Sequence, residues 1–307
     1  PPRPRARPAR AAVLLVPASP GPGLAQTVRA DASGERAALP PADLESLAAT
    51  AASLARSVGG VIASLRQVGV DVADTKSSIN DVVTAADREA ERLIAEGLRI
   101  ARPDDGILGE EGASVTGTTG ITWVVDPIDG TRAFIEGKRT WCVSIAVVED
   151  GLPLVGVLDC PAKNEIYEAD AFGPALLNGK AIAVAPAAVT GGGRLRVAGP
   201  KPMLRQAPAW MRAGPDIPYI PSLAYRIAMV ASGALDATFV KPNSHDWDLA
   251  AADLILRRAG GGLVERDGAP PVYAGRDPRH GALAAGSGRL LAEMAGVIAA
   301  LDAGTGN

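Results

Sequence analysis

The stretch that decides the fold of this chain reads Trp123-Val124-Val125-Asp126-Pro127-Ile128-Asp129-Gly130-Thr131-Arg132-Ala133-Phe134. An apolar strand ends here in Asp126, and we expect Pro127 to stop its pairing because proline has no backbone N–H. Three residues later, Asp129 and Gly130-Thr131 open a helix-like segment. This step can turn both carboxylates toward one point, beside N–H groups that form an anion site at a helix start. Taken alone, the pattern also fits an aspartate that merely caps a helix.

The composition points to hard-cation chemistry if the chain binds metal at all. The 307 residues include two histidines and two cysteines. So few nitrogen and sulfur ligands rule out, or nearly rule out, a His-rich metal site, a zinc ribbon and a disulfide scaffold. Carboxylates must then carry any metal, which favours cations such as Mg²⁺. The net charge of -3, from 31 basic and 34 acidic residues, gives no reason to expect a nucleic-acid or membrane-surface protein.

Outward from this stretch, the chain divides into three parts. Residues 1–40 are rich in Arg, Pro and Ala, and we expect a disordered extension there, while a short apolar run at 11–16 leaves a signal peptide open. We expect an N-terminal α+β subdomain at 41–185 and a C-terminal α/β subdomain at 186–307 that completes the site. No apolar run reaches the ~20 residues of a transmembrane helix. With two cysteines outside any C-x-x-C pattern, we expect buried thiols and a cytoplasmic protein.

Apolar periodicity predicts mixed α/β layering. In the first half we expect an amphipathic helix after Pro41, a helix at 84–100, a strand at 121–126, and strand pairs at 142–149 with 152–159 and 164–169 with 175–184. In the second half we expect strands at 194–198, 236–241, 262–265 and 282–285, and helices at 222–232, 247–259 and 288–301.

Two more acidic clusters lie at the ends of apolar elements. They are Gly109-Glu110-Glu111-Gly112 and His245-Asp246-Trp247-Asp248. Each has an ordinary explanation in isolation, a solvated turn for the first and the N-cap of the helix after Asp248 for the second. Asp87 alone is an acid in the first turn of a helix. The occurrence of all these acidic features in one chain favours a shared functional site over separate structural roles.

The combination resembles the inositol monophosphatase family of Mg²⁺-dependent, lithium-sensitive phosphatases. The matching pieces run in the family's order over roughly residues 42–300, and they are Lys76–Asp87, Ile107–Glu111, Trp123–Phe134, Trp247–Ala252 and Ala259-Gly260-Gly261. The resemblance implies a mixed α+β and α/β fold, a layered α-β-α-β-α sandwich of two subdomains with the site between them. Members of the family are often homodimers, and nothing in this sequence decides the assembly.

The resemblance also implies a ligand set for two or three Mg²⁺ ions. Glu110, Asp126 and the Ile128 carbonyl would bind the first ion, and Asp126, Asp129 and Asp248 the second. Several carboxylates so close together repel one another unless cations neutralise them.

The remaining implied roles concern water and phosphate. Glu110 and Asp87 would hold a third, weaker ion or its waters, and Thr131, hydrogen-bonded to Asp87, would orient the attacking water. The N–H groups of Gly130 and Thr131 would grip the phosphate. Such chemistry needs no nucleophilic Cys or His.

Two positions depart from inositol-type members. Glu136 stands where a His is common, and Lys241 stands where a Glu meets the sugar hydroxyls. A base at the substrate rim would suit a second anionic group, as in adenosine 3',5'-bisphosphate, unless Lys241 simply faces solvent. Arg226 and Ser222 complete this predicted rim, where Arg226 would pair with an anion or cover the helix surface.

We therefore expect a phosphomonoesterase acting on a small phosphate ester, with inositol monophosphate or a related sugar phosphate first. A 3'(2'),5'-bisphosphate nucleotidase is second and a histidinol-phosphatase third. A catalytically silent binding protein should have lost at least one ligand, and a metal-dependent hydrolase of another class is the remaining alternative. Arg279-His280-Gly281 spells the core of a histidine-phosphatase motif, whose chemistry needs a second His. The only other His, His245, belongs to the acidic cluster at 245–248, and the motif lies too near the C-terminus to open such a domain, so we expect His280 to be a loop or strand-entry residue.

Overall fold

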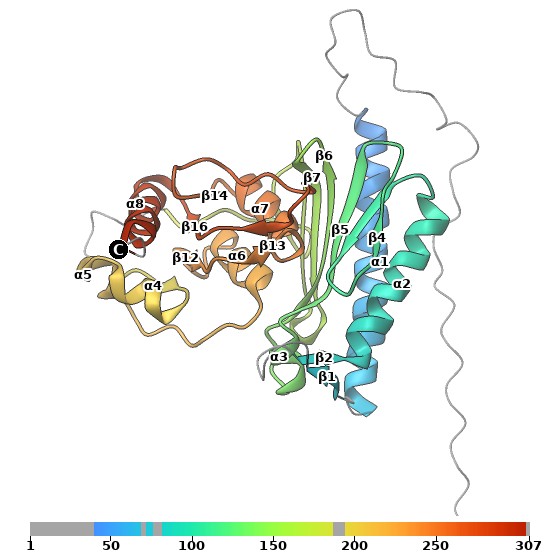
Figure 1. The fold of residues 1–307 in the computed structure, drawn as a ribbon, viewed down its shortest axis with the longest axis horizontal. Helices are drawn as coiled ribbons and strands as arrows, with labels where there is room; N and C mark the ends of the chain where they lie inside the picture. Colours follow the sequence, from blue (N-terminus) through green and yellow to red (C-terminus); the bar gives the residue numbers. More distant parts are fainter. Residues whose placement is uncertain (1–39, 69–71, 76–81, 187–193, 305–307) are drawn as a thin grey trace, which may run out of the picture.

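The computed structural model describes residues 40–68, 72–75, 82–186 and 194–304. Five layers stack in the order α-β-α-β-α (Figure 1), which confirms the layered sandwich. The predicted motif segment 76–81 lies outside the described residues, as do residues 1–39 of the extension. The division at 185/186 stays a prediction, because residues 187–193 beside it are not described either.

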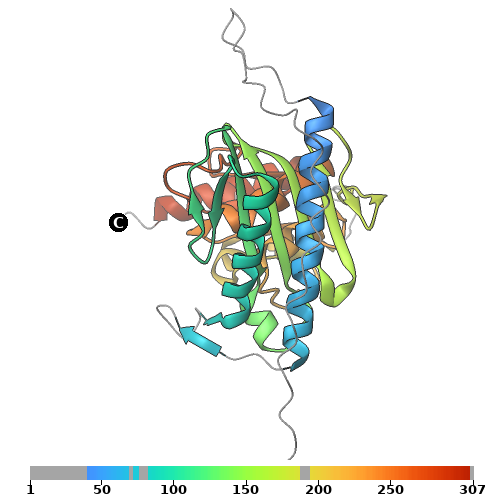
Figure 2. The ribbon, with the colours of Figure 1, turned by 90° about the vertical axis from the view of Figure 1, so that its right-hand side faces the viewer.

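The first two layers are a helix pair on a large sheet. Helices α1 (Pro41–Val68) and α2 (Ala85–Ala101) cover one face of it (Figure 2). The sheet has eight strands in the order β10-β9-β8-β7-β6-β5-β3-β4. Their bounds are β3 Gly106–Gly109, β4 Ser114–Val115, β5 Ile121–Asp129, β6 Cys142–Glu149, β7 Leu152–Cys160, β8 Glu165–Asp170, β9 Leu176–Leu177 and β10 Lys180–Ala181.

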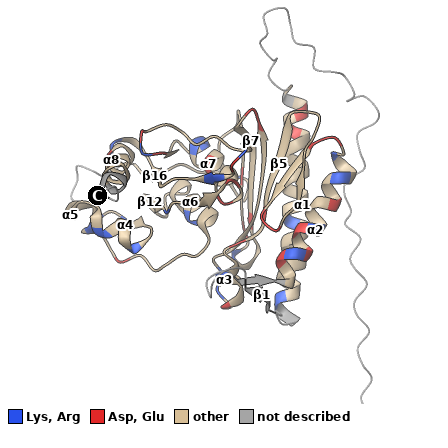
Figure 3. Ribbon diagram, in the orientation of Figure 1, with Lys and Arg blue, Asp and Glu red and all other residues tan. Residues whose placement is uncertain are grey.

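Helix α1 is held by its apolar stripe. Leu47, Leu54 and Val58 recur on one helix face and are buried against the large sheet. The segment Ala42–Arg66 is long and apolar enough to cross a membrane, but this packing makes it a core helix. Figure 3 shows acidic and basic residues together on α1 and α2, as on a solvated outer layer.

The other three layers enclose a second, smaller sheet. Helices α6 (Leu223–Ala231) and α7 (Asp246–Arg258) fill the space between the sheets, and their apolar side chains join one continuous core with β6 and β7. The smaller sheet has the order β11-β12-β16-β14, with β11 Val197–Ala198, β12 Ala237–Val240, β14 Gly262–Val264 and β16 Leu283–Gly286. Its outer face carries α4 Lys201–Gln206, α5 Ala209–Arg212 and α8 Gly288–Gly304.

Six short elements complete the described chain. They are the antiparallel pair β1 (Val72–Thr75) and β2 (Val82–Thr84), the helix α3 (Thr131–Ile135), the turn η1 (Pro161–Lys163), and the antiparallel pair β13 (Ser244–His245) and β15 (Arg279–His280). The β13–β15 pair, α4 and α5 are absent from the sequence prediction, because two- to six-residue elements carry little periodicity.

The sequence prediction was wrong about Pro127. Strand β5 continues past Pro127 to Asp129, with a shift of register between the pairs Asp126↔Ser144 and Asp129↔Cys142. Proline thus interrupts the pairing without ending the strand, as at a bulge. The strand pair expected at 164–169 and 175–184 forms in part, because β8 pairs with Leu176–Leu177. The rest of the expected second strand is divided, and Lys180–Ala181 turns back to pair with Leu176–Leu177.

Candidate active site

Three carboxylates from distant parts of the chain meet between the layers. Asp126 and Asp129 come from the end of β5, and Asp248 comes from the first turn of α7. Each contributes an oxygen atom, and the three oxygens lie within 4.8 Å of one another. This is a donor set that hard divalent cations prefer. The structure thus brings together three of the predicted metal ligands.

The irregularity at Pro127 explains how Asp126 and Asp129 face the same side. In a regular strand, residues three apart point to opposite faces. The register shift between the two aspartates removes this alternation. The N–H of Ile128 then donates to Oδ1 of Asp126 at 2.9 Å, which fixes the carboxylate within the turn.

The start of α6 holds Asp129. The N–H of Leu223 donates to Oδ1 at 3.0 Å, the N–H of Ala224 donates to Oδ2 at 2.8 Å, and the Ser222 hydroxyl donates to Oδ2 as well. A helix N-terminus stabilises a negative charge in this position. The carboxylate of Asp129 is therefore oriented by a segment from the other half of the chain.

Asp248 lies in the first turn of its helix, which begins one residue before the predicted start at 247. Helix α7 begins at Asp246 with His245 as its N-cap, so Asp248 is the third helical residue and not the N-cap. Its Oδ2 accepts the backbone N–H of His245 at 2.8 Å. This bond from the N-cap N–H to the side chain of the third helical residue is part of a capping box. It orients the carboxylate that joins the cluster.

Thr131 and Asp87 meet as predicted. The Thr131 hydroxyl lies 3.2 Å from Oδ1 of Asp87 and 3.1 Å from the Ile128 carbonyl oxygen. Asp87 sits in the first turn of α2 and is buried. The pair thus joins the helical layer to the turn after β5.

Glu110 is placed by a residue that the sequence prediction missed. The buried carboxylate of Glu91 accepts the N–H of Glu111 at 2.7 Å and that of Ala113 at 2.8 Å, which fixes the turn carrying Glu110. Asp87 and Glu91 are four residues apart on α2 and share its buried face. An acid at a buried helix position was the signal that could have revealed Glu91.

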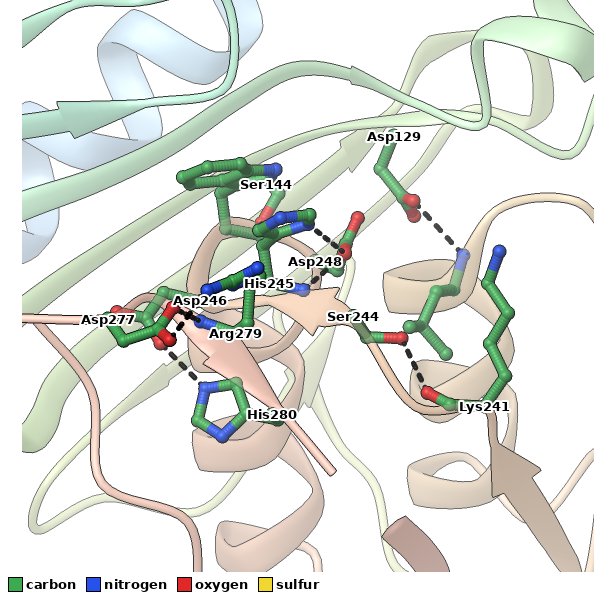
Figure 4. A network of polar contacts seen from close by, with 12 residues as sticks. Asp129, Ser144, Lys241, Ser244, His245, Asp246, Asp248, Asp277, Arg279 and His280 are labelled. Atoms are coloured by element: carbon green, nitrogen blue, oxygen red, sulfur yellow. Dashed lines mark hydrogen bonds and ion pairs between the residues drawn. The ribbon is translucent and has the colours of Figure 1, made fainter. Parts of the chain in front are cut away.

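A cleft of about 590 Å³ opens beside the cluster. Its lining includes Glu110, Asp129, Gly130, Thr131, Lys241 and Asp248. The rings of His245 and Trp247 also face it and stack nearly parallel at 4.6 Å. Figure 4 shows the Lys241 side chain running toward the Asp129 side of the cleft. Predicted metal, phosphate and rim residues therefore share one space.

The crowding of carboxylates disfavours their charged forms in the absence of a cation. Burial and the neighbouring Glu110, Asp129 and Asp248 raise the pKa of Asp126 well above its ordinary value. Burial and Asp129 raise the pKa of Asp248 to about 7. Burial also raises the pKa of Asp129, against the hydrogen bonds from Ser222, Leu223 and Ala224. A bound cation would remove this strain between like charges, so the residues present fit a metal.

Comparisons with known proteins agree with this geometry. A profile of the inositol monophosphatase family matches residues 43–303. The "Nus factor SuhB" of Xylella fastidiosa is 35% identical over 254 residues, covering 80% of this chain and 91% of the relative. The histidinol-phosphatase of Mycobacterium tuberculosis is 36% identical and covers 66% and 80%. The solved IMPase of Thermotoga maritima has a TM-score of 0.68 at 27% identity and covers 82% and 96%.

The chain belongs to the inositol monophosphatase family. The relatives of this family support a phosphatase, a hydrolase that acts on small phosphate esters. The acidic cluster of Asp126, Asp129 and Asp248 lies where such an enzyme could hold its metal.

One of the three predicted rim residues, Ser222, has another position in this phosphatase, whereas Arg226 lines the cleft. Ser222 is fully buried and caps α6 by accepting the N–H of Tyr225 at 3.1 Å, so it supports Asp129 and is not exposed at the rim. Arg226 is 6% exposed and does not cover a helix surface. Its guanidinium faces the cleft but donates to the carbonyls of Ile220 and Phe239, both at 3.2 Å.

The two departures from the inositol-type pattern also have clear positions. Lys241 follows the end of β12, is exposed, and lines the cleft. Glu136 forms surface ion pairs with Arg132 at 2.9 Å and with Lys138. Lys241 is therefore the departure that a substrate would meet.

Proposed function

We propose that this phosphatase hydrolyses a small phosphate monoester with Mg²⁺, and that inositol monophosphate or a related sugar phosphate is its first substrate class. The observation that carries the proposal is the carboxylate cluster of Asp126, Asp129 and Asp248, of which Asp129 and Asp248 line the same cleft as Thr131. The Glu110 side chain and the Ile128 carbonyl would complete the ligands of two or three ions. Lithium should inhibit such an enzyme.

The residues around the cluster have distinct tasks. Bound Mg²⁺ would supply charge neutralisation and a water molecule of lowered pKa. The Thr131 hydroxyl, held against Asp87, would accept a hydrogen bond from the attacking water and orient it, while Asp87 supports the hydroxyl. The backbone N–H groups of Gly130 and Thr131 would bind phosphate oxygens. Phosphoryl transfer needs this positioning more than covalent help.

The cellular location, binding partners and assembly of the enzyme are part of the same proposal. We expect a cytoplasmic enzyme whose partner is its small phosphate ester, with no nucleic-acid polymer and no membrane as a ligand. A homodimer is the assembly that the family resemblance favours. The described core runs across α6, α7 and both sheets, which supports a site formed by the proposed halves 41–185 and 186–307 together.

The direct test is a substrate panel at fixed Mg²⁺. It compares inositol 1-phosphate, fructose 1,6-bisphosphate, adenosine 3',5'-bisphosphate and histidinol phosphate by kcat/KM, with Asp129→Asn as the inactive variant. We expect hydrolysis by the native enzyme and none by the variant, which should stay folded because Asn still offers an acceptor to the start of α6. No hydrolysis of any ester with Mg²⁺ present would contradict the proposal and favour a silent binding protein.

Lys241 favours a second candidate, a 3'(2'),5'-bisphosphate nucleotidase. Its ammonium group in the cleft could pair with a second phosphate, and a hydrogen bond between charged groups contributes about 1.5–3 kcal/mol. Lys241→Glu should then raise KM for adenosine 3',5'-bisphosphate by about tenfold or more and leave KM for inositol 1-phosphate nearly unchanged. The matched control is Lys180→Glu, an exposed lysine on β10. Equal changes for both substrates would eliminate this candidate.

A further inference from the structure

A second polar cluster lies behind the cleft, on the side of α7 that faces away from it. Asp246 and His280 are its centre, and both are buried. They belong to the His245–Asp248 cluster and to the Arg279-His280-Gly281 sequence, neither of which the proposed chemistry explains fully. Figure 4 shows the two side chains pointing toward each other below the start of α7.

Helical geometry places Asp246 and Asp248 on different sides of α7. Residues two apart on a helix differ by about 200° around its axis. Asp248 therefore faces Asp129 and the cleft, while Asp246 faces the chain segment 273–280. The two acids thus connect one helical turn to two different parts of the molecule.

Both oxygens of Asp246 are already bound to this segment. Oδ1 lies 2.6 Å from Nε2 of His280, and Oδ2 accepts the N–H of Ala274 at 2.7 Å. We assign Nε2 of His280 as the donor and the Asp246 carboxylate as the acceptor in this contact. The side chain of Asp246 is 1% exposed. Asp246 is therefore an anchor and not a further metal ligand.

Backbone bonds extend the anchor on both sides. The N–H of Asp246 donates to the Pro278 carbonyl at 2.9 Å, and the N–H of Asn243 donates to the His280 carbonyl at 2.8 Å. The pairs Ser244↔His280 and His245↔Arg279 lie between them. The chain that leads into α7 is thus fixed to β15 up to the first helical residue.

This anchor matters because helix ends open more easily than helix centres. Asp248 is in the first turn of α7, and one of its oxygens is used by the N–H of His245. A small rotation of this turn would move its carboxylate away from Asp126 and Asp129. The position of the third ligand therefore depends on what holds residue 246.

We propose that Asp246 and His280 are positioning residues that hold the first turn of α7 so that Asp248 completes the metal site. The inference rests on the proposed function, since it assumes that the carboxylate cluster binds a divalent cation. It differs from a purely structural role in one respect. Loss of the His280 hydrogen bond must weaken cation binding by more than a comparable loss elsewhere on α7.

Tyr273 provides the comparison. Its hydroxyl donates to Oδ2 of Asp253 at 3.0 Å, so it ties the same loop to the same helix, but seven residues beyond Asp246. The rings of Tyr273 and His280 lie 5.4 Å apart. Tyr273→Phe should lower stability without moving Asp248. His280→Phe keeps a ring beside Tyr273 and removes the donor to Asp246.

The experiment measures Mn²⁺ binding to the full chain by electron paramagnetic resonance, with thermal unfolding of the same samples. We expect His280→Phe to raise the Mn²⁺ dissociation constant by about tenfold, as for other residues behind a metal ligand. His280→Gln, whose amide can donate to Asp246, should recover most of the affinity. Tyr273→Phe should lower Tm and leave the dissociation constant unchanged. If His280→Phe does not fold, His280→Met, which also lacks the donor, replaces it.

Three results would overturn the inference. Native affinity in His280→Phe would do so, as would an equal loss of affinity in Tyr273→Phe, because the effect would then be general loosening of α7. Absence of Mn²⁺ binding by the native protein would overturn the proposed function together with this inference. Native binding with unaffected variants would overturn the inference alone.

Discussion

The hydroxyl of Ser222 donates to the carboxylate of Asp129, and the same oxygen accepts the N–H of Tyr225. One buried side chain therefore caps α6 and orients a predicted metal ligand on β5. This contact crosses the boundary between the large sheet and the helices behind it. Loss of the Ser222 hydroxyl should thus lower both the stability of the fold and the affinity for a metal ion.

Replacing this serine tests the coupling. Ser222→Ala should lower the free energy of unfolding by about 1–2 kcal/mol, the usual value of an N-cap. It should also weaken Mg²⁺ binding by about 10–100-fold, because Asp129 loses a partner that orients it. Urea unfolding and calorimetric titration with Mg²⁺ measure the two effects. Ser222→Thr, which retains the hydroxyl, should remain near the native protein in both, and a stable Ser222→Ala variant with native Mg²⁺ affinity would contradict the coupling.

The backbone at Gly130 allows the turn after β5 to approach α6. Its φ is 92°, and a Cβ there would lie 2.8 Å from Cβ and 3.1 Å from Cα of Ser222. Gly130→Ala should therefore displace Ser222 and abolish activity. Gly112 is the matched control, because its φ is 110° and a Cβ there would meet nothing within 4 Å. Gly112→Ala should cost only the backbone strain, about 1–2 kcal/mol, and keep its kcat. Similar kcat values for the two variants would show that the close approach is unimportant.

The carboxylate cluster should make stability depend on pH and on Mg²⁺ together. Burial and Asp129 raise the pKa of Asp248 from an ordinary 3.8 to about 7. A group whose pKa is raised by folding stabilises the fold at low pH, and this contribution is lost as the pH rises through the folded value. The Tm of the metal-free protein should thus fall as the pH increases through about 7.

Added Mg²⁺ should reverse that loss. Since the cation binds the ionised carboxylates, it should raise Tm more at a pH above about 7 than below it. Thermal unfolding across this range, with and without Mg²⁺, checks both effects. Asp248→Asn removes the titrating group and should reduce the pH dependence. A Tm of the metal-free protein that rises through this range would contradict the electrostatic account.

Much of this molecule follows from local sequence. The apolar stripe of α1, the apolar runs of β6 and β7, and the Asp126–Thr131 pattern predict elements that the structure confirms, because burial on one helix face or on both faces of a strand leaves a direct trace in the sequence. The predicted contact of Thr131 with Asp87 also forms. It came from the family resemblance, since residues so far apart show no local signal of their contact.

Tertiary structure alone decided how the ligands are held. Pro127 was expected to end β5, yet pairing resumes at Asp129 because neighbouring strand β6 continues to offer partners. Ser222 was expected at the substrate rim, yet it is buried, because the start of α6 packs onto the turn after β5. The roles of Glu91 and Asp246 depend in the same way on which backbone N–H groups the fold brings to them.

The sequence by itself determined the residue types, and therefore the chemistry. The chain is poor in His and Cys and has carboxylates clustered at the ends of apolar elements, a composition suited to a hard cation and to phosphate. Only the tertiary structure decided which carboxylates face the cation and which serve as anchors. Asp248 and Asp246 illustrate the reason. They are the same residue type two positions apart, and the rotation of the helix sends one into the cleft and the other into the loop behind it.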